Sequence, residues 1–372
     1  MRHVALGVAA SLGAYQRGRC RCEEWATWSP GPFRPKGFQA ARPSRPRVTR
    51  APTGIDEVEA FVQQGPLYRE LLLSCAPPSH EWLEKGQALA ASLGPMDWQV
   101  ARRIYHLYLP LYFWMRHQLH EIRGRQGGAV VFGFTAPQGC GKTTTMNILQ
   151  ELFCLEGLRC EAVSIDDFYV PASWQEVLAE LHPDNDLMQT RGNAGTHDVR
   201  LGAETLQALK SSDDTEVLLP RYDKSAQGGR GDQVPRSSWK GVQTPCDVVI
   251  LEGWMVGFKP QEDAAKIHPG LRLVNDKLKS YQAWDDLLDA YCVLAVDDIE
   301  QVYTWRTEAE DSMKNTRGTG MSHTEVRDFV SHFMPAYHAY RPQLYAEAER
   351  GVDGKPTLVC HIGPDRLPYE SL

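Results

Sequence analysis

The sequence predicts an α/β fold: a parallel sheet with helices on both faces, preceded by a small helical region. Three observations support this prediction. A strand, a glycine-rich turn and a helix follow one another within residues 129–153. Apolar, β-rich segments then alternate with helical patterns toward the end of the chain, which is typical of a parallel sheet. Residues 55–125 carry helical patterns only.

Composition and charge narrow the class of protein. The chain has 372 residues, of which 42% are hydrophobic and 23% charged, as is ordinary for a soluble globular protein. The formal net charge is −7 overall but +8 over the first 50 residues, so the remainder carries −15. An acidic body argues against a nucleic-acid partner, but local basic groups could still bind an anionic small substrate.

Residues 1–50 are expected to be a disordered organelle-targeting leader. They are rich in arginine, almost free of acids, and end in a stretch with many prolines and arginines, so they cannot bury a core. This composition favours a transit peptide, although serine is scarcer than is typical. The apolar run 4–14 could instead be the core of a signal peptide, or the leader could have two parts. A disordered cytosolic tail is a further alternative.

Residues 51–125 form the predicted helical region. Helices are expected near 55–73 and 79–93, and a longer one follows. Its segment 104–115 is strongly apolar and aromatic, but twelve residues are too few to cross a bilayer. We therefore expect no membrane partner and a helix that packs on the next domain, kinked at Pro110.

Residues 126–372 are the predicted sheet domain. The expected strands are 129–134, 160–165, 247–251, 291–296 and 357–361, with helical patterns between most of them. The glycine-rich segment 228–232 is expected to be a mobile loop.

The segment 129–145, AVVFGFTAPQGCGKTTT, predicts a phosphate-binding loop of the P-loop NTPase type. The glycines let backbone N–H groups converge on an anion, and the helix that begins at about Lys142 adds partial positive charge. Lys142 can reach the outer phosphates of ATP, and the Thr143 hydroxyl can ligate Mg²⁺. The residues expected to hold the nucleotide are Ala136, Pro137, Gln138, Gly139, Cys140, Gly141, Lys142, Thr143 and Thr144.

Acidic residues that follow two of the strands are candidates for catalysis and metal binding. Asp166 and Asp167 follow strand 160–165, and Glu252 follows strand 247–251. Ligands of such sheets bind beyond the carboxyl ends of the strands, where carboxylates can accept a proton or help to hold Mg²⁺. Asp166 is the expected general base and a metal ligand, with Asp167 as the alternative base. Glu252 is expected to complete the Mg²⁺ shell through water.

Basic residues in two loops are candidates for binding an acidic substrate. They are Arg191 and His197 in the first loop and Arg221 and Lys224 in the second. Arginine suits bidentate binding of carboxylate or phosphate, although each charge could instead form a solvated ion pair. Arg306, in a predicted helix after the fourth strand, is expected to close over the phosphates and offset transferring charge.

The nine cysteines are scattered and lack zinc-site spacing, which favours a reducing compartment with free thiols. Cys140 lies in the phosphate-binding loop beside a helix N-terminus, where a thiol can become reactive. Alternatively, it is only a small residue in a tight turn.

These segments resemble plant-type D-glycerate 3-kinases, which are P-loop kinases related to the uridine kinase, phosphoribulokinase and pantothenate kinase group. The resemblance rests on GFTAPQGCGKTT, SIDDFY, RGNAGTHD, LPRYDKSAQGGRGD, LEGWMVGF and residues 305–340, in the family's order. Many P-loop proteins share the first of these, whereas RGNAGTHD and LPRYDKSAQGGRGD are more specific.

The resemblance implies Mg²⁺-dependent transfer of phosphate from ATP to the 3-hydroxyl of D-glycerate, as the last step of photorespiration in the chloroplast stroma. It implies that Lys142, Asp166 and Arg306 are catalytic and that Glu252 is the acid after the inner strand. It leaves open which cation binds the glycerate carboxylate: Arg221 and Lys224 are favoured, then the pair in the first loop.

Two other functions stay open at this point. One is another small-molecule kinase of the same group, acting on a nucleoside, pantothenate or a sugar phosphate. The other is a nucleotide-dependent switch protein, which is disfavoured because the chain has no Asn-Lys-x-Asp motif for reading guanine. The sequence does not determine the oligomeric state, and a monomer is compatible with it.

Overall fold

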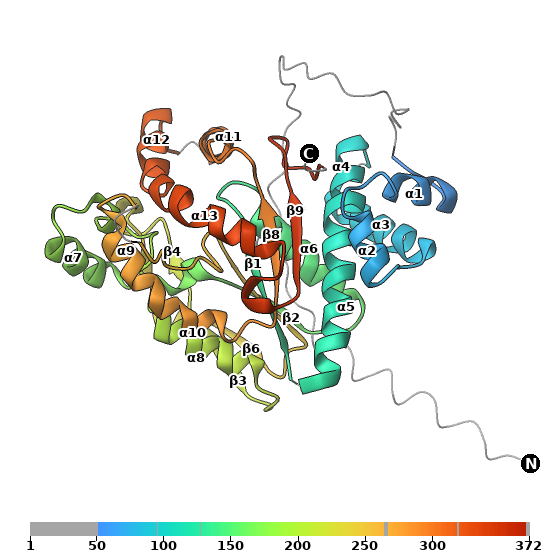
Figure 1. Ribbon diagram of the computed structural model, residues 1–372, viewed down its shortest axis with the longest axis horizontal. Coiled ribbons are helices and arrows are strands. Elements are labelled where there is room, and N and C mark those ends of the chain that lie inside the picture. Colours follow the sequence, from blue (N-terminus) through green and yellow to red (C-terminus); the bar gives the residue numbers. More distant parts are fainter. Residues whose placement is uncertain (1–50, 95, 127, 264–266, 318–319, 370–372) are drawn as a thin grey trace, which may run out of the picture. The chain divides into compact units, whose positions relative to one another are not determined.

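The computed structural model describes residues 51–369, apart from 95, 127, 264–266 and 318–319 (Figure 1). The expected leader, residues 1–50, lies outside the described residues. The described residues belong to one compact unit, so the division into a helical region and a sheet domain stays a prediction.

Five parallel strands form the central sheet in the order β2-β7-β1-β8-β9. They are β1 (Val130–Thr135), β2 (Cys160–Ser164), β7 (Val248–Gly253), β8 (Ala290–Ala295) and β9 (Thr357–His361). All residues of β1 and β8 are buried, as expected for strands covered on both faces. The predicted parallel sheet is confirmed, and each predicted strand end lies within two residues of the observed one.

Helices cover both faces of this sheet (Figure 1). One face carries α5 (Leu109–Gln126) and α6 (Lys142–Leu155), and the other carries α8 (Val199–Lys210) and α13 (Met334–Ala348). The remaining helices of the sheet region are α7 (Ala172–Leu181), α9 (Leu271–Leu278), α10 (Gln282–Asp285), α11 (Gln301–Arg317) and α12 (His323–Ser331). The predicted layering of helices on a parallel sheet is therefore confirmed.

Four helices open the described chain. They are α1 (Ile55–Val62), α2 (Tyr68–Ser74), α3 (Ser79–Leu93) and α4 (Trp98–Arg103). The prediction of one helix over 55–73 is wrong because the chain turns between α1 and α2. Gly65 lies in this turn, where a Cβ atom would come within 2.9 Å of the His106 ring. The helix predicted at 79–93 is confirmed.

The long helix before the sheet contains a π-helical turn, η1 (Ile104–Tyr108), just ahead of Pro110. The Leu109 N–H donates to the carbonyl of Ile104, five residues back. This turn lies where the sequence predicts a kink, because proline cannot continue the regular hydrogen-bond ladder.

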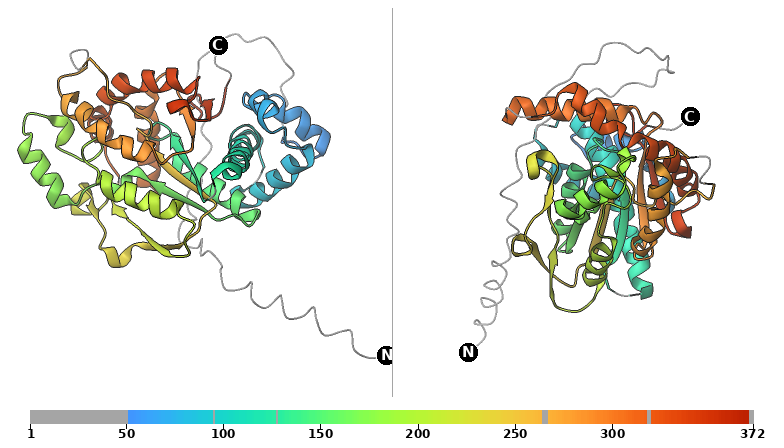
Figure 2. Two further views of the ribbon diagram at one scale, coloured as in Figure 1. Left: turned by 60° about the horizontal axis from the view of Figure 1, so that its bottom comes forward. Right: turned by 90° about the vertical axis from the view of Figure 1, so that its left-hand side faces the viewer.

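The segment 104–115 is buried on all sides. Trp82 of α3 contacts Phe113 at 4.7 Å between ring centroids, and Phe153 of α6 contacts Tyr112 at 5.0 Å. Figure 2 shows α1, α2 and α3 gathered beside α5. Because other helices cover the segment 104–115 from two sides, it has no polar stripe facing solvent. Within the described part of the chain, no helix is long and apolar enough to cross a membrane.

Two small antiparallel sheets lie outside the main one. β3 (Glu216–Leu219) pairs with β6 (Lys240–Gln243), and β4 (Tyr222–Asp223) pairs with β5 (Asp232–Gln233). The segment 228–232, predicted to be a mobile loop, lies in the connection between β4 and β5 and reaches the first residue of β5, and its mobility stays a prediction. The Gly231 N–H donates to the carbonyl of Ala226 at 2.8 Å within this turn. These strands were not predicted because each has only two to four residues, too few for a recognisable pattern.

Candidate active site

The strand register brings the predicted functional segments to one edge of the sheet. Glu252 of β7 lies opposite Phe134 of β1 and Ser164 of β2. These strands are parallel, so their carboxyl ends meet at the same edge. β1 leads into residues 136–141, which we call the phosphate loop. β2 leads into the acidic turn Ile165–Phe168, a 3₁₀ helix that contains Asp166 and Asp167.

Two glycines give the phosphate loop its shape. Gly139 and Gly141 have φ angles of 80° and 97°, a region that favours glycine. A Cβ atom on Gly139 would come within 2.7 Å of the Trp305 Cβ atom in α11. Gly141 is the N-cap of α6, so the loop passes directly into the helix N-terminus, as predicted.

Backbone hydrogen bonds hold the start of this loop. The Ala136 N–H donates to the carbonyl of Gly253 at 3.1 Å, and the Gln138 N–H donates to the Tyr337 hydroxyl at 3.0 Å. The nine residues expected to bind the nucleotide, 136–144, are consecutive in the loop and the first turn of α6. The loop is therefore tied to β7 and to α13.

Lys142 lies across the phosphate loop. Its Nζ atom donates to the carbonyl oxygens of Ala136 and Pro137, each at 3.1 Å. Both partners belong to the loop itself. The ammonium group is thus already at the loop that would bind phosphates. Phosphate oxygens carry more negative charge than carbonyl oxygens, so they would be stronger acceptors for this group.

Glu252 and Thr143 are the predicted oxygen ligands for Mg²⁺ next to the phosphate loop. One carboxylate oxygen of Glu252, Oε2, is buried without a hydrogen-bond partner. Burial raises the pKa of Glu252, and the charge of Lys142 opposes that rise. Thr143 is exposed in the first turn of α6. Within the described ranges, no cluster of three or more His, Cys, Asp or Glu could hold a metal, so any Mg²⁺ here needs phosphate or water ligands as well.

Cys140 is buried within the phosphate loop. Its side chain is 5% exposed, and burial raises the pKa of its thiol, with the charge of Lys142 acting in the opposite direction. A reactive thiol needs exposure and a lowered pKa. The geometry therefore favours the alternative that Cys140 is a small residue in a tight turn.

The acidic turn contains two carboxyl groups with opposite pKa shifts. Burial alone would raise the pKa of Asp166. The Nζ atom of Lys224, however, lies 2.6 Å from the Asp166 Oδ2 atom, and its charge holds the pKa of Asp166 well below its usual range. Burial raises the pKa of Asp167 to about 6, although the Tyr222 N–H donates to it at 3.2 Å. Asp166 is thus the fully ionised member of the pair near neutral pH.

The four basic residues predicted to bind the acidic substrate differ in their surroundings. Lys224 pairs with Asp166, and exposed Arg221 acts electrostatically on Asp167. Arg191 instead holds the β4–β5 hairpin: its guanidinium donates to the carbonyls of Gly229 and Arg230 and lies over the Tyr222 ring. The structure therefore brings Lys224 and Arg221 to the acidic turn but gives Arg191 a structural task.

His197 is not a cation in this structure. Its side chain is 6% exposed, and burial lowers its pKa to about 4. The ring stacks on Tyr169, which follows the acidic turn, at 4.4 Å, and Nδ1 lies 2.6 Å from the Tyr281 hydroxyl. A neutral imidazole close to the acidic turn can donate or accept a hydrogen bond but supplies no charge.

Arg306 reaches the phosphate loop only with its backbone. A Cβ atom on Gly139 would lie 3.5 Å from the Arg306 nitrogen. Its guanidinium forms an ion pair with Glu310, which is 1% exposed, and lies over the Phe329 ring of α12. The predicted closure of this side chain over phosphates would require it to leave Glu310.

Arg366 is a contact of the phosphate loop that the sequence analysis missed. Its Nε donates to the carbonyl of Gly139 at 2.8 Å, and its Nη2 donates to Glu308 of α11 at 2.7 Å. The guanidinium also lies over the Trp305 ring. No sequence signal could have revealed it, because Arg366 follows β9, 227 positions after Gly139.

Comparison with known proteins places the chain among small-molecule kinases. No protein-family model matches the chain. The chloroplastic D-glycerate 3-kinase of Arabidopsis thaliana is 39% identical over 333 residues, which are 85% of this chain and 73% of the relative. The "Probable ATP-dependent kinase TDA10" of Saccharomyces cerevisiae is 35% identical over 253 residues, 64% of this chain and 86% of the relative.

A solved structure agrees with this relationship. The D-glycerate 3-kinase of Cryptococcus neoformans superimposes with a TM-score of 0.63 at 30% identity, over 72% of this chain and 99% of that chain. Identity and coverage of this size, together with the phosphate loop at the edge of a five-stranded parallel sheet, establish that this chain belongs to the D-glycerate 3-kinase family.

Proposed function

We infer that the protein transfers the terminal phosphate of ATP to the 3-hydroxyl of D-glycerate, giving 3-phospho-D-glycerate and ADP. The observation that carries this inference is the meeting of three segments at one edge of the sheet. The phosphate loop, the acidic turn and Glu252 lie together there by strand register. Family membership supports glycerate as the acceptor.

The phosphate loop is the proposed binding site for ATP. Backbone N–H groups of residues 136–144 and the N-terminus of α6 suit the negative charge of the phosphates. Lys142 would exchange its bonds to the Ala136 and Pro137 carbonyls for bonds to the outer phosphates. The ammonium group of Lys142 is already at the loop, so this exchange requires no movement of the backbone.

Thr143, Glu252 and Asp166 are the proposed Mg²⁺ ligands, directly or through water. The unpartnered buried oxygen of Glu252 fits such a site, since hard oxygen donors suit this ion. When bound, Mg²⁺ would neutralise charge on the phosphate oxygens. The side chains would hold the cation at the carboxyl end of β7.

Asp166 is the proposed base for the glycerate hydroxyl. Lys224 keeps its carboxylate ionised, so Asp166 can accept a hydrogen bond and then a proton. A strong base is not required, because transition states of phosphoryl transfer are mostly loose and catalysis comes mainly from positioning and charge stabilisation. Lys224, with Arg221, is also the proposed partner of the glycerate carboxylate.

Arg306 remains the proposed residue that offsets charge during transfer. Its backbone already lies beside the phosphate loop, and its guanidinium would have to exchange Glu310 for phosphate oxygens. Movement of α11 and α12 over the nucleotide would allow this exchange and would exclude water.

We further propose that the protein acts in the plastid stroma, in the last step of photorespiration. The composition of residues 1–50 supports this location, as does a relative named as chloroplastic. A fluorescent protein fused to residues 1–50 should accumulate in chloroplasts, and cytosolic fluorescence would contradict the proposal.

An acceptor panel tests the proposed activity. Purified protein with Mg-ATP should release ADP rapidly with D-glycerate and far more slowly with uridine, pantothenate or ribulose 5-phosphate. Stimulation by one of the other acceptors instead would move the protein to another kinase of the same group. ADP release that ignores every acceptor would favour a nucleotide-dependent switch.

A further inference from the structure

A buried nitrogen atom of His197 has no role in the account so far. Its Nε2 has no hydrogen-bond partner among the described residues, although the side chain is almost fully buried. Buried polar atoms are nearly always paired, so an unpaired one indicates a missing partner. His197 pairs with Tyr169 through a backbone bridge and stacks on its ring at 4.4 Å, and Tyr169 directly follows the acidic turn, so the imidazole is close to the proposed acceptor site.

The partner of the other ring nitrogen identifies the tautomer. The Tyr281 hydroxyl accepts a hydrogen bond from the Gly195 N–H at 3.1 Å. Its own proton must then go to an acceptor, and His197 Nδ1, at 2.6 Å, is the acceptor that the described residues offer. Because Nδ1 accepts this hydrogen bond, it carries no proton, and the ring proton is on Nε2. The unpaired atom of His197 is therefore a donor.

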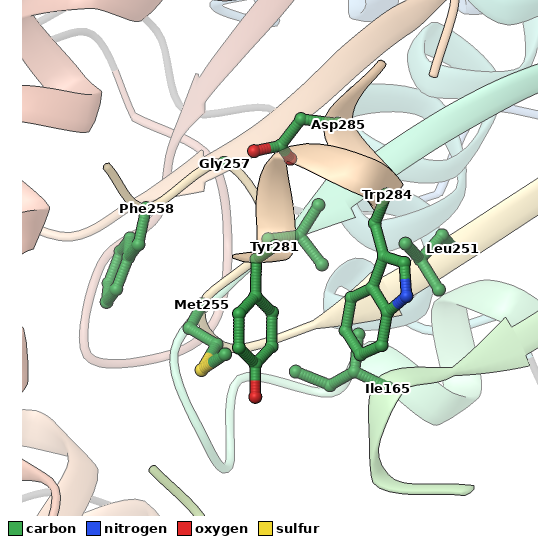
Figure 3. A pocket seen from close by; sticks show the side chains of 9 residues that line it. Ile165, Leu251, Met255, Gly257, Phe258, Tyr281, Trp284 and Asp285 are labelled. Atoms are coloured by element: carbon green, nitrogen blue, oxygen red, sulfur yellow. The ribbon is translucent and has the colours of Figure 1, made fainter. Parts of the chain in front are cut away.

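The surroundings of Tyr281 fix this arrangement. Its ring lies edge-on to Trp284 at 4.9 Å, and the Trp284 indole N–H donates to the carbonyl of Val199 at 2.8 Å. Figure 3 shows both rings lining a cavity, with the Tyr281 hydroxyl pointing away from Asp285. The volume open to water there is about 10 Å³, room for a single water molecule at most. The Tyr281 ring has little space for another position.

We propose that Tyr281 holds His197 as a neutral Nε2–H donor and that this N–H binds the 2-hydroxyl of the acceptor, which makes the pair a determinant of specificity. The proposal rests on the proposed function. The carboxylate of the acceptor has cationic partners in Lys224 and Arg221, whereas a single neutral donor matches a hydroxyl oxygen. A site built to bond a hydroxyl discriminates strongly against an analogue that lacks it.

A comparison of two acceptors tests this assignment. D-Glycerate and 3-hydroxypropionate share the reacting hydroxyl and the carboxylate, but only glycerate has the 2-hydroxyl. Tyr281→Phe should lower kcat/KM about tenfold for D-glycerate and leave kcat/KM for 3-hydroxypropionate and KM for ATP unchanged. His197→Leu should cause the same selective loss. His197→Gln, which keeps an amide donor near the position of Nε2, should restore part of the activity.

Tyr105→Phe is the matched control. Tyr105 is a buried tyrosine of η1 whose hydroxyl has no hydrogen-bond partner in the described part of the chain. Its variant should keep wild-type kinetics with both acceptors. Melting temperatures of all variants would show that each is folded at the assay temperature.

Nitrogen-15 NMR of the labelled enzyme gives an independent readout. The His197 ring should show its proton on Nε2 in the wild type and a mixture of tautomers in Tyr281→Phe. A proton on Nδ1 in the wild type, or equal losses with both acceptors in the variants, would overturn the inference while leaving the kinase activity intact. A wild-type enzyme indifferent to D-glycerate would instead overturn the proposed function as well.

Discussion

The ammonium group of Lys224 lies 2.6 Å from a carboxylate oxygen of Asp166, although the two residues are 58 positions apart. Asp166 follows β2 and Lys224 follows β4, so this ion pair joins the main sheet to the small hairpin. The sequence indicated separate tasks for them, proton acceptance for one and substrate binding for the other. In the structure each is the partner of the other, so changing one changes the charge that the other experiences.

Substitution of Asp166 tests the proposed base. Asp166→Asn should lower kcat by a factor of about 10²–10⁴, as expected for loss of a general base, with little change in the affinity for ATP. Steady-state kinetics with each substrate varied would measure both effects. Lys224→Met keeps the aliphatic stem and should chiefly raise KM for D-glycerate. If Asp166→Asn turned over normally, the base would have to be another group, with Asp167 the first candidate.

Substitution of Lys142 should separate activity from stability. The hydrogen bonds of its side chain in the described structure go to carbonyls of its own loop, so Lys142→Ala should change the free energy of unfolding by only about 0.5 kcal/mol. Turnover should fall by about 10²–10³, the typical cost of removing one donor that stabilises transition-state charge. Lys279→Ala, which removes a surface ion pair with Asp276, is the control. Near-normal turnover by Lys142→Ala would exclude the lysine from the mechanism.

Substitution of Arg366 should change KM for ATP but not KM for D-glycerate. Arg366→Gln removes the charged donor to the Gly139 carbonyl and the ion pair with Glu308. Hydrogen bonds of charged groups contribute about 1.5–3 kcal/mol, so KM for ATP should rise by about 10- to 100-fold. KM for D-glycerate should hold its wild-type value. Arg200→Gln, in an exposed ion pair of α8, is the control, and an unchanged KM for ATP in Arg366→Gln would show that the contact does not shape the nucleotide site.

His106 should make the fold sensitive to acid. Burial lowers its pKa from 6.5 to about 4, and its Nε2–H donates to the Phe61 carbonyl at 2.9 Å. Above pH 6.5 the residue is neutral in both the folded and unfolded states, so it has no effect on the pH dependence there. Between pH 6.5 and 4 the unfolded state binds a proton that the folded state does not, and stability falls by up to about 3 kcal/mol.

Urea denaturation at pH 7.5, 6 and 5 would measure this loss. His106→Gln will be less stable at pH 7.5 but should lose less stability on acidification than the wild type. The difference between the two pH profiles isolates His106 from other titrating groups, including His197. Parallel profiles would contradict the assignment of a neutral buried histidine.

The sheet and the phosphate loop could be predicted because their signals are local. Each strand is a short apolar run, and the loop is one contiguous segment between a strand and a helix. The break at Gly65 depends instead on the His106 ring, which comes from another helix. The π-helical turn before Pro110 likewise depends on hydrogen bonding that residue types do not specify.

The meeting of the candidate site residues at one edge of the sheet could be predicted, but their contacts could not. Asp166 follows β2 and Glu252 lies near the carboxyl end of β7, so the rule that ligands bind at strand carboxyl ends located both. The partners of His197 and Gly139 lie 84 and 227 positions away. Tyr281 and Arg366 belong to no recognisable motif, and only the tertiary structure brings them to the site. For the same reason the sequence could not show that Arg191 binds backbone carbonyls of the hairpin.

Identification of the reaction product tests the central claim most directly. Wild-type protein would be incubated with Mg-ATP and D-glycerate and followed by phosphorus-31 NMR, with Lys142→Ala in parallel. The account predicts equal amounts of ADP and 3-phospho-D-glycerate from the wild type and almost none from the variant. ADP accompanied by free phosphate alone, or phosphorylation at the 2-hydroxyl, would contradict it.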